Sequence, residues 1–144
     1  MKFISAEEFL KQPKEIQKVF IDWWEPQLFD LYIFDKRIIE IVRTSDENMI
    51  LPCKSNNIWE EKKHCIPLLT EGQLRKFIED KTNSKIDMMF FKNGYDFELF
   101  SIGKLQDEFE AILPEGAFEE LPCSLLQAYW KVALEIAREG KDNE

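Results

Sequence analysis

The chain has 144 residues, with 28 Asp or Glu against 19 Lys or Arg, and so carries a formal net charge of −9. Hydrophobic residues make up 44% of it, which is enough for a folded core and excludes the disordered, collagen-like and disulfide-scaffold classes. The negative balance argues against a protein that holds DNA, RNA or anionic lipid through its overall field, because each phosphate contact requires Lys or Arg. We therefore expect one soluble α+β domain over residues 1–144.

The compartment is predicted from the N-terminus and the cysteines. The first residues lack the apolar core and cleavage site of a signal peptide, and no apolar run approaches the ~18 residues of a membrane span. Cys53, Cys65 and Cys123 are widely spaced, which is typical of free thiols rather than of a disulfide framework. Both features predict a cytoplasmic protein that does not contact membranes.

The first half of the chain predicts two helices and a hairpin. Ser5 and Glu8 have the spacing of a capping box, which predicts a short helix there. A second helix begins after Pro13 and continues to Trp23, because its apolar residues recur at helical spacing. β-Branched and aromatic runs at 28–34 and 38–42 predict a β-hairpin, residues 49–51 are a candidate third strand, and residues 53–66 are predicted to be mainly loop.

The middle of the chain predicts a helix and a second hairpin. A capping box at Thr70 predicts a helix to about Lys81. Asn93-Gly94 favours a type I′ turn, because both central residues of that turn need a positive φ. The turn would place Phe90 opposite Phe97 and leave one face almost wholly apolar. The opposite face would carry Asp87, Met89, Phe91, Asp96, Glu98 and Phe100.

The last third predicts one more strand and a buried helix. Alternating residues predict a strand over 105–113, and a capping box at Ser124 opens a helix that would end at Gly140. The polar strip of this helix is narrow, so we expect it to be the most buried helix and to lie against a sheet. The predicted fold is an antiparallel sheet packed by N-terminal, central and C-terminal helices.

Enzyme signatures are missing from the sequence. No dinucleotide fingerprint, phosphate loop, nucleophile elbow or paired-histidine zinc motif occurs. His64 and Cys65 are neighbours that would point to opposite faces of an extended segment, which disfavours a Cys–His nucleophile pair. The cysteines and His64 match no zinc-ligand spacing. We predict a non-enzymatic protein with no catalytic residues, metal or cofactor.

Two carboxylate arrangements keep a metal-dependent nucleic-acid enzyme open as the alternative. Asp46, Glu60 and Lys62 loosely match the spacing of restriction-type nucleases, in which carboxylates hold Mg²⁺ and the Lys positions water. On the predicted hairpin, three acids share one face and form a second candidate cation site: Asp87, Asp96 and Glu98.

Most of the net charge lies between residues 96 and 120, where eight acidic residues and one lysine leave −7 of the total −9. If the strands pair, Glu108 and Glu110 would be flanked by Asp96 and Glu98 in a regular negative array. Such an array serves either solubility or the recognition of a basic partner, and Phe118 is either a buried core residue or an exposed anchor of that surface. The predicted partner-binding residues are Asp96, Glu98, Glu108, Glu110, Phe118, Glu119 and Glu120.

Three stretches together resemble small acidic proteins encoded in phages and prophages of low-GC Gram-positive bacteria. They are Val19–Pro26 (VFIDWWEP) with Asp30–Tyr32 (DLY), Ile66–Leu74 (IPLLTEGQL) and Leu125–Ala133 (LLQAYWKVA). No catalytic motif accompanies the resemblance. It implies a phage accessory protein, a group in which small acidic members are often inhibitors of host defence, including anti-CRISPR proteins that mimic DNA.

These expectations combine into one functional hypothesis. The chain would act in the host bacterial cytosol by binding a basic, nucleic-acid-handling defence protein, such as a CRISPR effector, through an acidic surface that mimics DNA. It would not itself bind nucleic acid or membrane. The alternatives are the metal-dependent enzyme and a phage replication or structural accessory protein that acts through self-association as a homo-oligomer.

Overall fold

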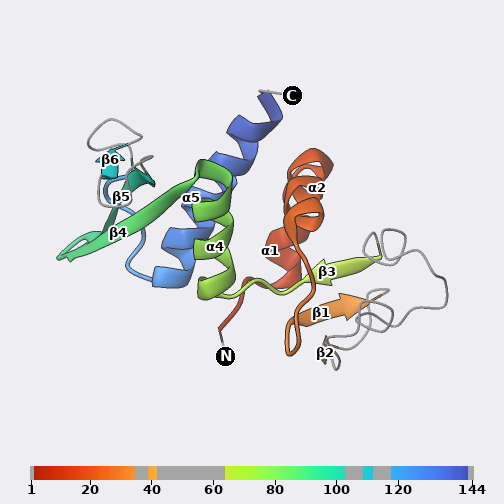
Figure 1. Cartoon of the computed structure of the whole chain (residues 1–144). Coiled ribbons are helices and arrows are strands. Elements are labelled where there is room, and N and C mark those ends of the chain that lie inside the picture. Colours follow the sequence, from red (N-terminus) through yellow and green to blue (C-terminus); the bar gives the residue numbers. More distant parts are fainter. Residues whose placement is uncertain (1, 35–38, 42–63, 103–108, 112–117, 143–144) are drawn as a thin grey trace. The chain divides into compact units, whose positions relative to one another are not determined.

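The computed structural model describes residues 2–34, 39–41, 64–102, 109–111 and 118–142 (Figure 1). Contacts divide the chain into two compact units, Phe3–Leu69 and Thr70–Glu144, the latter including Met1–Lys2. Each unit combines helices with an antiparallel sheet, so the predicted α+β class is confirmed, although the described strands form two sheets of three rather than one sheet. Among the described residues, no helix is long and apolar enough to cross a membrane.

The unit Phe3–Leu69 begins with the two predicted helices. Its elements are α1 (Ala6–Leu10), α2 (Lys14–Trp23), β1 (Leu31–Phe34), β2 (Ile39–Ile41) and β3 (Cys65–Pro67). The predicted cap is present, since the Ser5 hydroxyl accepts from the Glu8 N–H at 3.2 Å. The rings of Phe9 and Phe20 meet edge to face, with 6.2 Å between centroids, and hold α1 against α2.

The sheet of this unit has the strand order β2–β1–β3. The predicted hairpin is confirmed, because Leu31 pairs with Ile41 and Ile33 with Ile39. β3 pairs with the other edge of β1, where a loop was predicted, and the Cys65 side chain is buried against Trp24 and Tyr32. A strand of three residues that ends in Pro is too short to show an alternating pattern in the sequence.

The unit Thr70–Glu144 contains the remaining elements, which are α4 (Glu71–Thr82), β4 (Ser84–Phe91), β5 (Gly94–Ile102), β6 (Phe109–Ala111) and α5 (Leu125–Asp142). The predicted capping box is complete, since Thr70 and Gln73 each accept a backbone N–H from the other. Asn83 adopts a φ of 49°, which ends α4 and turns the chain directly into β4. α5 continues past the predicted stop at Gly140 to Asp142.

Helices α4 and α5 lie side by side and pack against one face of the β4–β5–β6 sheet (Figure 1). The Tyr129 ring of α5 lies 4.9 Å from the Phe97 ring of β5, and its hydroxyl contacts the Met88 sulfur at 3.6 Å. The predicted packing of the C-terminal helix on a sheet is therefore confirmed. The buried residues of α5 are Leu126, Ala128, Tyr129, Trp130, Val132, Ala133, Ile136 and Ala137.

The turn between β4 and β5 lies one residue earlier than predicted. Phe91 pairs with Gly94, so Lys92 and Asn93 form the turn, and Phe90 faces Tyr95 instead of Phe97. Because each residue of β4 changes its partner by two positions, every side chain stays on the predicted face of the hairpin. The pairing prediction was wrong, but the division into an apolar and an acidic face was correct.

Candidate protein-binding surface

The β4–β5 hairpin has one covered face and one open face. Ile86, Phe97 and Leu99 are buried on the side of the helices. On the other side, the β4 side chains are exposed. We call this side the acidic face. Its positions are those of Lys85, Asp87, Met89, Phe91, Asp96, Glu98 and Phe100.

Two carboxylates share one position of the ladder on the acidic face. Asp87 pairs directly with Glu98, and side chains at such positions are about 5 Å apart at their Cβ atoms. The nearest lysine on β4, Lys85, lies 3.8 Å from the carboxylate of Glu79 instead. Among the described residues, neither Asp87 nor Glu98 takes part in an ion pair. Since like charges directly opposite each other destabilise a sheet, this pair costs the free protein stability.

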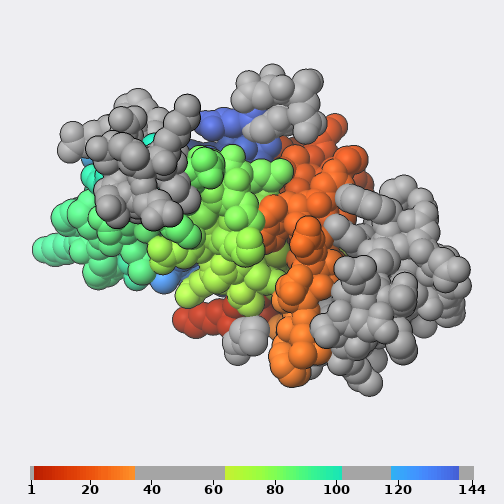
Figure 2. All heavy atoms as spheres, in the orientation of Figure 1, coloured from red at the N-terminus to blue at the C-terminus, as the bar shows by residue number. Residues whose placement is uncertain are grey.

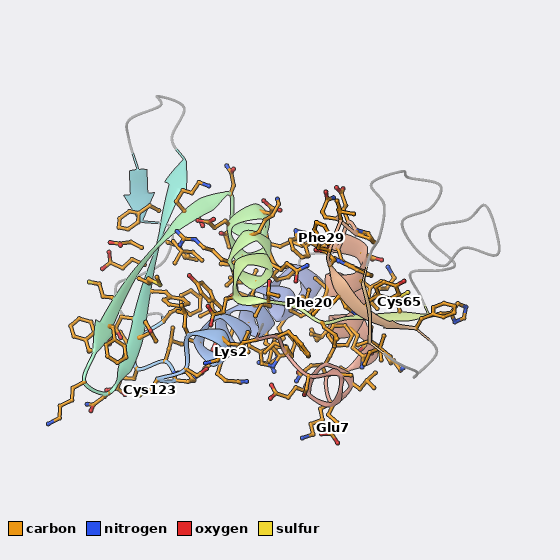
Figure 3. All side chains as sticks on the ribbon, turned by 90° about the horizontal axis from the view of Figure 1, so that it is seen from below. Lys2, Glu7, Phe20, Phe29, Cys65 and Cys123 are labelled. Carbon is orange, nitrogen blue, oxygen red and sulfur yellow. The ribbon has the colours of Figure 1, made fainter. Side chains whose placement is uncertain are left out.

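Two more acids join this face through the segment 118–121. Leu121 forms a β-bridge with Tyr95, and the Glu120 N–H donates to the Asp96 carboxylate at 3.0 Å. Glu119 and Glu120 are both exposed. The chain then continues to the exposed Cys123, near the turn end of the hairpin (Figure 3). The segment therefore brings carboxylates that are distant in sequence beside Asp96.

Phe118 is not an exposed anchor. Its side chain is only 5% exposed and belongs to the core, while its carbonyl accepts from the Phe97 N–H at 3.1 Å. The pairing of its segment with β5 holds it in the sheet, so that the ring is buried and the following two acids are exposed. The prediction of an exposed Phe118 ringed by acids was wrong, and the alternative of a core residue is correct.

The predicted array around β6 also differs from the structure. Glu110 pairs with Ser101. Ser101 is three residues from Glu98, which corresponds to about 10 Å along β5. Glu108 lies outside the described residues. Of the seven predicted residues, the structure gathers three near the turn end of the hairpin, Asp96, Glu119 and Glu120, and Glu98 lies two residues further along β5 on the same face as Asp96.

An exposed apolar strip lies in the second half of β4. The sequence placed Met89 and Phe91 on the open face of the hairpin, but the exposure of Met88 and Phe90 was not predicted. The exposed fractions are 41% for Met88, 37% for Met89, 62% for Phe90 and 52% for Phe91. The hairpin lies at the surface in Figure 2, and Figure 3 shows ring-bearing side chains near its turn end. Phe90 lies on the helix side as predicted, yet it is exposed. The run of four large apolar residues beside the turn was the signal available in the sequence.

The metal-dependent alternatives gain no support from the described residues. They contain no group of three or more His, Cys, Asp or Glu side chains suited to a metal ion, and this includes Asp87, Asp96 and Glu98. Asp46, Glu60 and Lys62 lie outside the described residues, as does Cys53. His64 is exposed, whereas Cys65 is buried, in agreement with the expected opposite orientations.

A further exposed aromatic residue lies in the other unit. Phe29 is 70% exposed and has a φ of 73°, a conformation that is unfavourable for a bulky residue (Figure 3). Its loop is fixed by Asp30, whose carboxylate accepts from the Trp24 indole at 3.0 Å and from the Gln27 N–H at 2.9 Å. Nothing in the sequence singled out this residue.

Comparison with known proteins finds no match for this chain among protein-family models, curated proteins or solved structures.

Proposed function

We propose that the chain is a non-enzymatic protein that binds a basic protein surface through the acidic face of the β4–β5 hairpin. The observation that carries the proposal is the Asp87–Glu98 pair, two carboxylates opposite each other that form no ion pair in the described part of the chain, since Lys85, the next residue of β4 on this face, lies beside Glu79 instead. A Lys or Arg from a partner would relieve their repulsion. The free energy that the repulsion costs the free protein would then favour binding.

The neighbours of this pair fit a binding surface better than a purely solubilising one. Exposed Met89 and Phe91 lie on the same face as Asp87. Interfaces commonly combine a central apolar contact with a polar rim, and aromatic residues and Met are enriched in them. Solubility alone would not require large apolar side chains among the acids.

The partner proposed is a nucleic-acid-handling protein of the host. Carboxylates at regular strand spacing would occupy a Lys/Arg surface that otherwise takes phosphates, and the chain would inhibit by competition. A CRISPR effector or another defence protein fits the phage setting that the sequence resemblance implies. Such binding would be fast and would weaken with salt, because opposite charges steer the encounter.

A charge-reversal experiment tests the proposal. The immobilised chain captures proteins from a low-GC Gram-positive bacterial lysate, and the captured protein is then assayed for DNA or RNA binding in the presence of the chain. The double variant Glu98→Lys with Glu119→Lys should abolish capture. The control Glu25→Lys with Glu139→Lys alters net charge equally at exposed positions outside the hairpin and should leave capture intact.

Two results would support the proposal together: capture that falls steeply between low and high salt, and a captured protein whose nucleic-acid binding the chain inhibits. Capture that is independent of salt and unaffected by the hairpin reversals would refute it.

A further inference from the structure

β4 is an edge strand, because the sheet order is β4–β5–β6. Near the start of β4 this edge is covered by α4. The Ile86 N–H donates to the Glu79 carboxylate at 2.9 Å, and the Ile86 carbonyl accepts from the Arg75 guanidinium at 3.0 Å. In an antiparallel strand, alternate residues direct their backbone groups to the same edge, so those of Met88 and Phe90 point the same way as those of Ile86.

The backbone of Met88 and Phe90 has no partner on this edge among the residues that the structure describes. We call these two positions the free edge. Proteins usually protect such an edge with charges, Pro or a bulge. Here, exposed apolar side chains flank it on both faces of the hairpin instead: Met88 and Phe90 on one, Met89 and Phe91 on the other.

We infer that the free edge takes up an extended segment of the partner as an added β-strand, an inference that rests on the proposed function. In strand addition, backbone hydrogen bonds supply affinity and alternate side chains supply selectivity. Ile86 is already occupied and the turn at Lys92–Asn93 ends the strand, so two outward residues remain. They allow about four backbone hydrogen bonds to a segment of about four residues.

Charge complementarity selects the occupant. An antiparallel segment places one residue opposite Asp87, and Asp87 with its neighbour Glu98 favours Lys or Arg there. The exposed Met88, Met89 and Phe90 favour apolar residues at the other three positions. The inferred occupant is therefore three apolar residues followed by a basic one, on a basic protein. A second copy of this chain would instead bring a further net charge of −9 to this edge.

The test uses the full chain and the capped peptide Lys-Thr-Val-Ile-Val-Arg-Thr-Lys, whose Arg aligns with Asp87 in the antiparallel register. NMR of the backbone amides gives both the site and the Kd. We expect the amides of Met88 and Phe90 to shift. N-methylation of both Val residues removes the two peptide donors and should weaken binding about tenfold or more, and an Arg-to-Glu peptide should bind several-fold more weakly.

Two variants at one position separate the backbone from the side chain. Phe90→Pro and Phe90→Thr both lose the ring, but only Pro loses the outward N–H, and no bond to β5 is lost because that N–H points away from the sheet. The Pro variant should bind the peptide about tenfold more weakly than the Thr variant. Equal affinity of the N-methylated peptide for the unchanged chain, or shifts confined to other residues, would overturn strand addition.

The outcomes distinguish this inference from the proposed function. If the hairpin charge reversals abolish lysate capture while Phe90→Pro and Phe90→Thr capture equally, the proposed function stands and strand addition fails. If the peptide binds the free edge while the hairpin charge reversals leave lysate capture unchanged, strand addition stands and the proposed function fails. A dimer of the chain alone that Phe90→Pro dissociates and Phe90→Thr does not would overturn the choice of a basic partner.

Discussion

The backbone carbonyl of Leu121 occupies the space that a side chain at Gly94 would need. A Cβ at position 94 would lie 1.8 Å from this carbonyl oxygen, and the Gly94 φ of 142° is itself strained for other residues. The bridge between Tyr95 and Leu121, with N–H to carbonyl distances of 2.9 and 3.2 Å, holds the two segments together. Gly94 therefore permits a close approach between segments rather than a hairpin turn.

Replacing this glycine should disrupt the turn end of the hairpin. Gly94→Ala is expected to lower the free energy of unfolding by about 2 kcal/mol or more, since only backbone movement relieves the clash. Gly72→Ala is the matched control, because a Cβ there meets nothing within 4 Å in the first turn of α4, and should raise stability by about 0.5 kcal/mol. Chemical denaturation measures both, and an unchanged midpoint for Gly94→Ala would contradict the close approach.

The contact with Leu121 also explains why the turn was predicted one residue too late. Asn93-Gly94 is a local signal for a turn in which both residues have positive φ. Only Gly94 has a positive φ here, and it does so inside β5, in response to a segment far along the chain. The helix starts at Ser5, Thr70 and Ser124 were predictable because a cap acts within four residues.

The sequence did not predict which aromatic side chains of the site are exposed. Phe118 and Phe90 are both aromatic residues near acids or a turn, yet Phe118 is buried and Phe90 is 62% exposed. The difference arises from tertiary structure, since segment 118–121 is paired with β5 whereas the end of β4 is not covered by the helices. Alternation assigns a side chain to a face, but it does not say how far the opposing helices extend along that face.

The contacts between α4 and β4 should carry measurable stability. The Glu79 carboxylate is the partner of the Ile86 N–H, and Ile86 is buried. Glu79→Ala leaves that donor unsatisfied and is expected to cost about 1–2 kcal/mol. Lys85→Ala removes only an exposed lysine 3.8 Å from Glu79 and should cost less than about 0.5 kcal/mol. Hydrogen exchange at the Ile86 amide would show the loss directly, and similar costs for both variants would contradict the assignment.

Tyr129 should make stability depend on pH in the alkaline range. Burial raises the pKa of its hydroxyl, while the Arg75 guanidinium opposes that shift and Glu79 and Glu71 add to it. The unfolded chain therefore loses this proton first, near the ordinary tyrosine pKa of about 10, so the free energy of unfolding should fall as pH rises above that value. Tyr129→Phe should show a shallower decline over the same range. Parallel curves for the two proteins would contradict the raised pKa.

The Asp87–Glu98 pair predicts opposite effects on stability and on binding. Glu98→Thr removes the like charge opposite Asp87 and introduces a residue that favours strands, so the free energy of unfolding should rise by about 0.5 kcal/mol. The same change removes a carboxylate from the acidic face and should weaken capture of the basic partner. Thermal unfolding and the lysate capture assay measure the two effects on one sample.

Glu119→Thr is the control for this prediction, because Glu119 is exposed outside the named strands. It should weaken capture without raising stability. A surface selected only for solubility predicts a different pattern, in which either variant reduces solubility and neither alters capture. If Glu98→Thr gains stability with no loss of capture, the repulsion between Asp87 and Glu98 is real, but it does not serve recognition.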